Sequence, residues 1–351
     1  MIDRRSFGRI VGSGAAGAVL AGLSTACSTA PSAVSGPAPA APAGGKESPD
    51  AAASFGPVRQ ITAGVLNVGY VEAGPADGPA VVLLHGWPYD IHSFEGVAPL
   101  LAAKGYRVVV PYLRGHGTTR FLQRSTPRAP QQSAFALDIV ALMDALGIKK
   151  AILAGFDWGS RTADIIAALW PERVKGLVSV TGYLITNRKA NQQPLPPKSE
   201  WAWWYQYYFA TDRGRLGLER YRSDLARLVW KFNSPTWAFD DATFERTAEA
   251  FDNPDYVAIV IGNYRWRLGL VEGDPRYDAL EARPARGPVI TVPTVTLDGA
   301  EDPFTPPGNG ASYRAKFTGP YAHRTLDGIG HNLPQEAPAA FARAVMDVDG
   351  M

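Results

Sequence analysis

The residues with the clearest chemical meaning lie at 155–159, where the sequence reads Gly-Phe-Asp-Trp-Gly. Two glycines flank a carboxylate, each two positions away, and glycine is the residue that lets backbone segments approach closely in a tight turn. An apolar run at 151–154 predicts a short buried strand, and residues 162–170 predict a helix. We therefore expect a strand, a sharp turn and a helix, with Asp157 at the turn as a nucleophile that attacks carbon. The alternative is that Asp157 only caps the helix.

A histidine and a second acid that suit such a nucleophile occur later in the chain, each after an apolar run. Residues 292–297 predict a strand that is followed by an acidic segment with Asp302. Residues 324–326 lead to His331, which precedes a predicted helix at 337–348. Ligands bind beyond the carboxyl ends of strands in an open α/β sheet, so we expect these side chains to meet there. His331 would act as a base that Asp302 orients.

Two more motifs complete the set: His-Gly-Trp-Pro at 85–88, after another apolar run, and Arg-Gly-His-Gly at 114–117. With Asp157, Asp302 and His331, they resemble in kind and order the motifs of the α/β-hydrolase superfamily. In esterases and lipases of that superfamily the turn carries serine. A carboxylate at that position resembles the epoxide hydrolase and haloalkane dehalogenase branch.

The resemblance covers the chain from about Phe55 to its end and implies an α/β-hydrolase fold. Such a fold has a mostly parallel, doubly wound sheet with an inserted α-helical lid. It divides this chain into a first part of the core at 55–182, a lid at 183–285 and a second part of the core at 286–351. An insertion of that length is too long for an ordinary connection between neighbouring strands.

Two positions depart from the family pattern. Tyr112 stands where the family usually has Asp, and Ser160-Arg161 stand where a further glycine is common. Neither departure touches the expected catalytic groups, so we expect them to alter the pocket or its rim.

The aromatic segment at 200–209 is predicted to form a single lid helix. Trp201, Trp204 and Tyr208 are spaced by three and four residues, which predicts a buried stripe along that helix. Most of the aromatic rings in this segment are therefore expected to serve packing.

In epoxide hydrolases one lid tyrosine lies in a Tyr-Gln-x-Tyr-Phe segment, which starts here at Tyr205, and a second precedes an arginine, as Tyr264 does. The resemblance therefore implies that Tyr205 and Tyr264 bind the substrate and donate protons. Opening an epoxide leaves an alkoxide that needs a proton, and a phenol with a pKa near 10 stays protonated at neutral pH. The backbone N–H groups of Trp87 and Trp158 are expected to form an oxyanion hole, and both residues are also expected to contact the substrate.

Two other functions compete with epoxide opening. A haloalkane dehalogenase would use the same Asp157 and would need only N–H donors for the halide, which Trp158 and the lid tryptophans offer. Trp87 favours epoxides, because the dehalogenase branch often has Asn at that position. A non-catalytic ligand-binding homologue is the third interpretation, and the intact Asp157, Asp302 and His331 argue against it.

The N-terminal segment at 1–27 indicates an export signal, because an Arg-Arg pair precedes a weakly apolar run at 10–23. This arrangement resembles a twin-arginine signal. Cleavage after Ala26 and lipidation of Cys27 are alternatives, and residues 28–54 predict a flexible Ala/Pro/Ser/Gly linker. We expect a periplasmic or secreted protein that is attached to a membrane only if Cys27 is lipidated.

The amino-acid composition limits the kinds of partner and cofactor that we expect. The formal net charge is +2, from 35 basic and 33 acidic residues, which argues against a nucleic-acid partner. The single cysteine lies in the export signal, so the mature fold cannot depend on a disulfide. The expected chemistry needs no metal and no organic cofactor. The aromatic lid suggests a small apolar or aromatic substrate.

Overall fold

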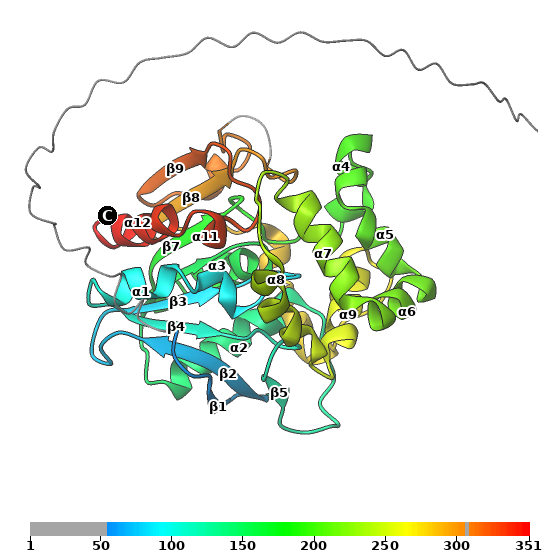
Figure 1. The fold of residues 1–351 in the computed structure, drawn as a ribbon, viewed down its shortest axis with the longest axis horizontal. Helices are drawn as coiled ribbons and strands as arrows, with labels where there is room; N and C mark the ends of the chain where they lie inside the picture. The colour runs from blue at the N-terminus through cyan, green and yellow to red at the C-terminus, as the bar shows by residue number, and fades with distance from the viewer. Residues whose placement is uncertain (1–54, 306–308) are drawn as a thin grey trace, which may run out of the picture. The chain divides into compact units, whose positions relative to one another are not determined.

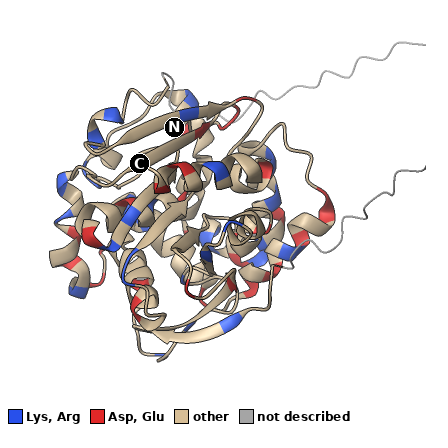
Figure 2. Ribbon diagram, turned by 90° about the vertical axis from the view of Figure 1, so that its left-hand side faces the viewer, with Lys and Arg blue, Asp and Glu red and all other residues tan. Residues whose placement is uncertain are grey.

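The computed structural model describes residues 55–305 and 309–351, which form a central sheet flanked by helices and a helical lid (Figure 1). The predicted export signal at 1–27 and linker at 28–54 lie outside the described residues, and both stay predictions. Within the described part, every helix is too short or too polar to cross a bilayer. Basic and acidic residues are interspersed along this part of the chain (Figure 2).

The central sheet has nine strands. Eight follow the order β1-β2-β4-β3-β6-β7-β8-β9, and β5 pairs with β2 at the edge. The pairs that involve β2 are antiparallel, and every pair from β4 to β9 is parallel. The strands are β1 (Arg59–Ala63), β2 (Leu66–Ala73), β3 (Ala80–Leu84), β4 (Arg107–Pro111), β5 (Arg120–Phe121), β6 (Ala151–Gly155), β7 (Val174–Val180), β8 (Thr294–Gly299) and β9 (Tyr321–Leu326).

The order of the sheet reverses between β3 and β6, because the chain runs from β3 to β4 on one side and returns to β6 on the other. The last residues of the two strands, Leu84 and Gly155, are register partners. Both strands are short, apolar and almost entirely buried, as central parallel strands are. This reversal is where doubly wound sheets bind ligands. The loop with the His-Gly-Trp-Pro motif and the turn with Asp157 both leave the sheet there.

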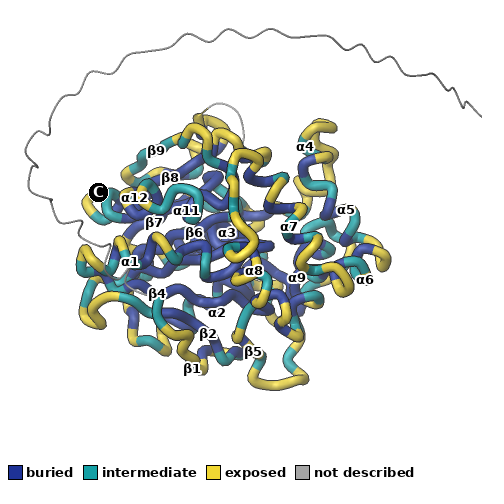
Figure 3. Tube along the Cα trace, in the orientation of Figure 1, coloured by how far each residue is buried: buried dark blue, intermediate teal, exposed yellow. Residues whose placement is uncertain are grey.

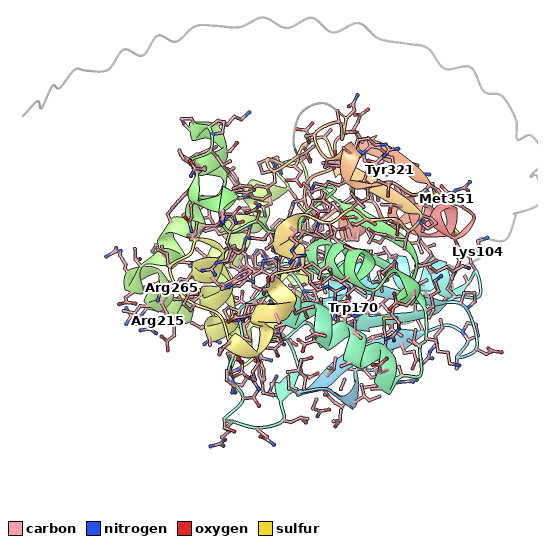
Figure 4. The ribbon with its side chains drawn as sticks, turned by 180° about the vertical axis from the view of Figure 1, so that it is seen from behind. Lys104, Trp170, Arg215, Arg265, Tyr321 and Met351 are labelled. Atoms are coloured by element: carbon pink, nitrogen blue, oxygen red, sulfur yellow. The ribbon has the colours of Figure 1, made fainter. Side chains whose placement is uncertain are left out.

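Helices cover both faces of the sheet. α1 (Val97–Ala102) packs against α12 (Pro338–Asp349), and α2 (Gln132–Ala145) packs against α3 (Trp158–Leu169). The two pairs lie on opposite faces, as the front and back views show (Figure 1, Figure 4). The central strands and the inner sides of these helices form the buried core (Figure 3). The short helix α11 (Leu333–Glu336) leads into α12.

The lid is the chain between β7 and β8, and its helices lie beside the core (Figure 1). The predicted α/β-hydrolase fold with an inserted helical lid is therefore confirmed. All of the lid α-helices fall within the predicted range 183–285. They are α4 (Pro197–Ala202), α5 (Trp204–Ala210), α6 (Asp212–Arg220), α7 (Arg222–Asn233), α8 (Asp241–Ala248), α9 (Tyr256–Arg267) and α10 (Asp278–Glu281).

The prediction of one helix at 200–209 is wrong, because the helix breaks at Trp203, whose φ of −99° and ψ of 26° separate α4 from α5. The break changes the direction in which later side chains point. Trp201, which precedes the break, is 65% exposed, while Tyr205 and Phe209, which follow it, are buried. The predicted buried stripe through Trp201 is also wrong, since it assumed one continuous helical phase.

The close approach of α3 to the sheet at Gly159 leads to a testable prediction. A Cβ at this position would overlap the backbone carbonyl oxygen of Leu84 at the end of β3. Gly159→Ala should lower the free energy of unfolding by about 2–3 kcal/mol, because a buried central strand cannot move aside freely. Denaturant unfolding measures this.

Gly350→Ala is the matched control. Its Cβ would meet its nearest neighbouring atom at 3.6 Å, an ordinary contact. We expect it to change the free energy of unfolding by less than about 0.5 kcal/mol. Equal losses in the two variants would contradict the close approach at Gly159.

Candidate active site

Asp157 occupies the turn between β6, which ends at Gly155, and α3, which begins at Trp158. The predicted strand–turn–helix is confirmed, with the helix starting earlier than the predicted residue 162. The backbone of Asp157 has φ 52° and ψ −119°, a conformation that costs a non-glycine residue roughly 1–3 kcal/mol. Asp157 stands at the N-cap position, yet its side chain makes no capping hydrogen bond. The carboxylate of Asp157 therefore does not cap α3.

His331 lies between two carboxylates. It follows β9, and its Nδ1 is 2.7 Å from Oδ2 of Asp302, which follows β8. On its other side, Nε2 is 3.7 Å from Oδ2 of Asp157. Asp302 is held in turn by the backbone N–H of Phe304, at 2.9 Å from Oδ1. All three members of the predicted set meet at the carboxyl end of the sheet, and His331 and Asp302 are buried.

The backbone N–H of Trp87 donates to Oδ1 of Asp157 at 2.8 Å. His85 holds the loop that carries this donor, because its Nε2 accepts from the N–H of Leu113 at 3.0 Å. Nδ1 of His85 therefore carries the ring proton and donates to the carbonyl of Gly86 at 2.9 Å. Burial lowers the pKa of His85, which keeps the ring neutral. Gly86 is also required, since a Cβ there would overlap the side chain of Asp157.

Trp158, the second predicted oxyanion donor, is the first residue of α3, where a backbone N–H has no acceptor within the helix. Its indole ring packs against Phe135 and His116, with ring centroids 5.4 and 6.0 Å away. The indole Nε1 is buried and has no hydrogen-bond partner among the described residues. The ring of Trp158 thus packs in the interior, and its oxyanion role stays a prediction.

The two predicted lid tyrosines converge on the same loop. Tyr205 comes from α5 and Tyr264 from α9, and both rings pack on the indole of Trp87 with centroids 5.2 and 5.4 Å away. Their own ring centroids are 5.5 Å apart. Burial raises the pKa of both phenols, and the negative charge of Asp157 adds to the effect. Both therefore remain protonated hydrogen-bond donors at neutral pH.

The central charges stabilise one another. Burial by itself would raise the pKa of Asp157, but the neighbouring His331 and then the charge of Arg161 bring that pKa below its usual value. Burial by itself would lower the pKa of His331, but the charges of Asp302 and Asp157 raise it to about 10. At neutral pH the site therefore holds an ionised Asp157 next to a protonated His331.

A cavity of about 410 Å³ opens above Asp157. Trp87, Trp158 and Tyr264, which the sequence placed in contact with substrate, do not contribute to its wall. Among residues 55–305 and 309–351, no group of three or more His, Cys, Asp or Glu side chains is arranged to hold a metal ion. The wall is made of Asp157, Arg161, Thr181, Tyr183, Leu184, Trp203, Tyr205, Gln206, Arg267, Phe304, Ser312, Tyr313, Lys316 and His331.

Most of the polar residues of the wall were not predicted from the sequence. Arg161 carried a signal, because it departs from the family pattern and lies four residues after Asp157, on the same side of α3. Arg267 and Lys316 carried none, since each reaches the cavity through contacts between elements that are distant in the sequence.

Comparison with known proteins identifies the family of this chain. A family model described as alpha/beta hydrolase fold matches residues 79–338. The crystal structure of a putative epoxide hydrolase from Klebsiella pneumoniae subsp. pneumoniae MGH 78578 superposes with a TM-score of 0.83 at 60% sequence identity, covering 85% of this chain and 99% of that one.

Two curated proteins are more distant. An epoxide hydrolase from Caballeronia sordidicola is 26% identical over 285 residues, which are 75% of this chain and 84% of that protein. Epoxide hydrolase B of Mycobacterium tuberculosis is 33% identical over 158 residues, and the match spans under half of that protein, 44% of its length. The chain belongs to the α/β-hydrolase family, and its similarities place it in the epoxide hydrolase branch.

Proposed function

We propose that this protein hydrolyses epoxides to vicinal diols through an ester on Asp157. The observation that carries the proposal is the convergence of three groups on one carboxylate. Trp87 donates to Oδ1, His331 faces Oδ2, and Tyr205 joins Asp157 in the cavity wall. The names of the relatives support the same reaction class.

In the first step, Oδ2 of Asp157 attacks one carbon of the epoxide and the bond from that carbon to the ring oxygen breaks. The departing oxygen takes a proton from Tyr205 or Tyr264, so it leaves as a hydroxyl. The result is a hydroxyalkyl ester of Asp157. Oδ1 becomes the ester carbonyl oxygen and keeps its hydrogen bond from Trp87.

Ester formation changes the state of His331. The ester is neutral, so His331 loses one of the two negative charges that raise its pKa to about 10. The pKa falls, and the proton that His331 releases restores the tyrosine. The imidazole becomes a neutral base only after the nucleophile has reacted.

In the second step, neutral His331 removes a proton from water, and the resulting hydroxide attacks the carbonyl carbon of the Asp157 ester. The oxyanion that forms on Oδ1 accepts hydrogen bonds from the N–H groups of Trp87 and Trp158, donors that are worth roughly 3–4 kcal/mol each in other hydrolases. Collapse of this intermediate releases the diol, whose new oxygen atom takes the remaining proton. Asp157 is again ionised and His331 again protonated.

The phenol hydroxyls provide a test that separates epoxide opening from halide displacement. Replacing Tyr205 and Tyr264 together by Phe keeps the rings that pack on Trp87 and removes only the proton donors. The double variant should form the ester from styrene oxide more than about 100-fold more slowly, the contribution expected of a general acid. Rapid-quench kinetics on wild type and variant measure this step.

Tyr221→Phe is the control, because Tyr221 is an exposed lid tyrosine away from the cavity. It should react at the wild-type rate. Epoxide opening at the wild-type rate by the double variant would contradict the proposal. So would halide release from 1-bromobutane by a protein that ignores all epoxides, which would assign the site to haloalkane dehalogenation.

The fall in basicity of His331 gives a second prediction. Asp157→Asn mimics the neutral ester, so the pKa of His331 should drop from about 10 by about 1–3. NMR titration of histidine-labelled protein measures it, with His331→Gln to assign the resonance. Asp347→Asn, which removes a carboxylate that pairs with Arg324 on the surface, should leave the His331 pKa in place. An unchanged pKa in Asp157→Asn would show that Asp157 does not control the base.

A further inference from the structure

The cavity wall carries more positive charge than the proposed chemistry uses. Besides the protonated His331, three basic side chains line it, Arg161, Arg267 and Lys316, and Asp157 is the single carboxylate among the described residues of the wall. A neutral, apolar epoxide would need none of these cations. Buried charge is costly unless it has a partner, so its presence at a reacting centre calls for a functional explanation.

A hydrogen bond from Nε fixes the side chain of Arg161, which also lines the cavity. It lies one turn into α3, where its backbone N–H donates to the carbonyl of Asp157 at 3.1 Å. Its Nε donates to the carbonyl of Leu184 at 2.9 Å, which sets the direction of the guanidinium. The side chain is buried, and it forms no ion pair with a described residue.

Arg267, the last residue of α9, approaches from the lid. Its Nε is buried without a hydrogen-bond partner among the described residues, and its guanidinium lies over the ring of Tyr264 at 5.5 Å. Arg114 shows what a structural buried arginine looks like in this chain. It is paired with both carboxylate oxygens of Asp138 at 2.6 and 2.8 Å.

Neither guanidinium group forms an ion pair with a described residue, and the charge of Arg267 acts on Arg161. Burial, and after it the positive charge of Arg267, lowers the pKa of Arg161 to about 10. Like charges that are brought together inside a wall store electrostatic energy, and an anion bound between them would release it. Lys316 differs, because its Nζ already donates to the carbonyl of Gly287 at 2.8 Å.

We propose that the substrate is a small epoxide that carries a carboxylate, which Arg161 and Arg267 bind together. This inference rests on the proposed function and names its substrate class. The planar fork of arginine matches a carboxylate, and two cations offset the repulsion between that group and the ionised Asp157. The epoxide oxygen then faces Tyr205 in the cavity wall, and the ring of Tyr264 packs against that of Tyr205.

Another part of the wall suits the rest of such a molecule. Trp203 stacks on Phe304 with ring centroids 5.6 Å apart, and Phe304 in turn contacts the ring of His331 at 5.2 Å. This apolar surface accommodates a short hydrocarbon part, and a cavity of about 410 Å³ limits its size. The sequence suggested a small apolar or aromatic substrate, and the substrate that we infer carries an anionic group as well.

The test compares 2,3-epoxybutanoate with its amide, which has nearly the same shape and no charge. Wild type should prefer the acid by at least about tenfold in kcat/KM, as expected for hydrogen bonds to a charged group. Arg267→Gln should remove this preference while kcat/KM for the amide falls less than about threefold. Arg215→Gln removes the same charge from the outer edge of the lid and should keep the wild-type preference (Figure 4).

The arginines have one competing role, which is to make the tyrosines more acidic, because the charge of Arg267 opposes the rise in their pKa. In that case Arg267→Gln would slow the acid and the amide by the same factor. That outcome would overturn the carboxylate site.

A binding measurement separates this inference from the proposed function. Butanoate cannot react, so calorimetry should find it bound to wild type, about tenfold more weakly to Arg267→Gln, and butanamide unbound. Turnover of neutral epoxides without butanoate binding would overturn the carboxylate site and leave the proposed function standing. Butanoate binding by a protein that opens no epoxide, charged or neutral, would overturn the proposed function and with it the assigned substrate.

Discussion

The close backbone approach between the start of α3 and the end of β3 is the constraint on which the site depends. A Cβ on Gly159 would overlap the carbonyl oxygen of Leu84, so α3 can begin close to the sheet only because glycine stands there. This approach holds Asp157 in its unfavourable conformation and turns its carboxylate away from the helix that it precedes. On the neighbouring strand end, Gly86 leaves room for the same carboxylate, and Trp87 donates to it. The strain at the turn is compensated by the packing of two buried central strands.

The protonation states in the site depend on the charges of neighbouring side chains. Asp157 and Asp302 hold a protonated His331 between them, so the resting site keeps its nucleophile ionised and its base occupied. In the mechanism that we propose, the base becomes free only when the nucleophile has lost its charge, which sets the order of the two chemical steps. The charge of Arg161 adds to this balance by lowering the pKa of Asp157, and Arg267 and Lys316 bring further positive charge to the wall, which distinguishes this cavity from an apolar one.

The sequence predicted those features that are set locally. Short apolar runs identified β3 and β6, and the two glycines around Asp157 predicted the turn because no larger residue fits. It also singled out Asp302 within an acidic segment, although Asp298 lies in the same stretch. The structure brings Asp302 to His331, while Asp298 accepts from the hydroxyl of Tyr313 at 2.9 Å.

Features that depend on long-range packing were not predictable in this way. The predicted helical phase of the lid is wrong beyond Trp203, because a single break redirects every later side chain. Arg267 reaches the cavity only because α9 packs against α5, a contact that no local pattern encodes.

The central claim is that Asp157 forms an ester with substrate, and oxygen exchange tests it most directly. One turnover of wild-type enzyme in excess over styrene oxide, run in heavy-oxygen water, should place the label in the carboxylate of Asp157 and not in the diol. Mass spectrometry of the peptide that contains Asp157 locates it. A labelled diol with an unlabelled Asp157 would mean that water attacks the epoxide directly, and the ester mechanism would be wrong.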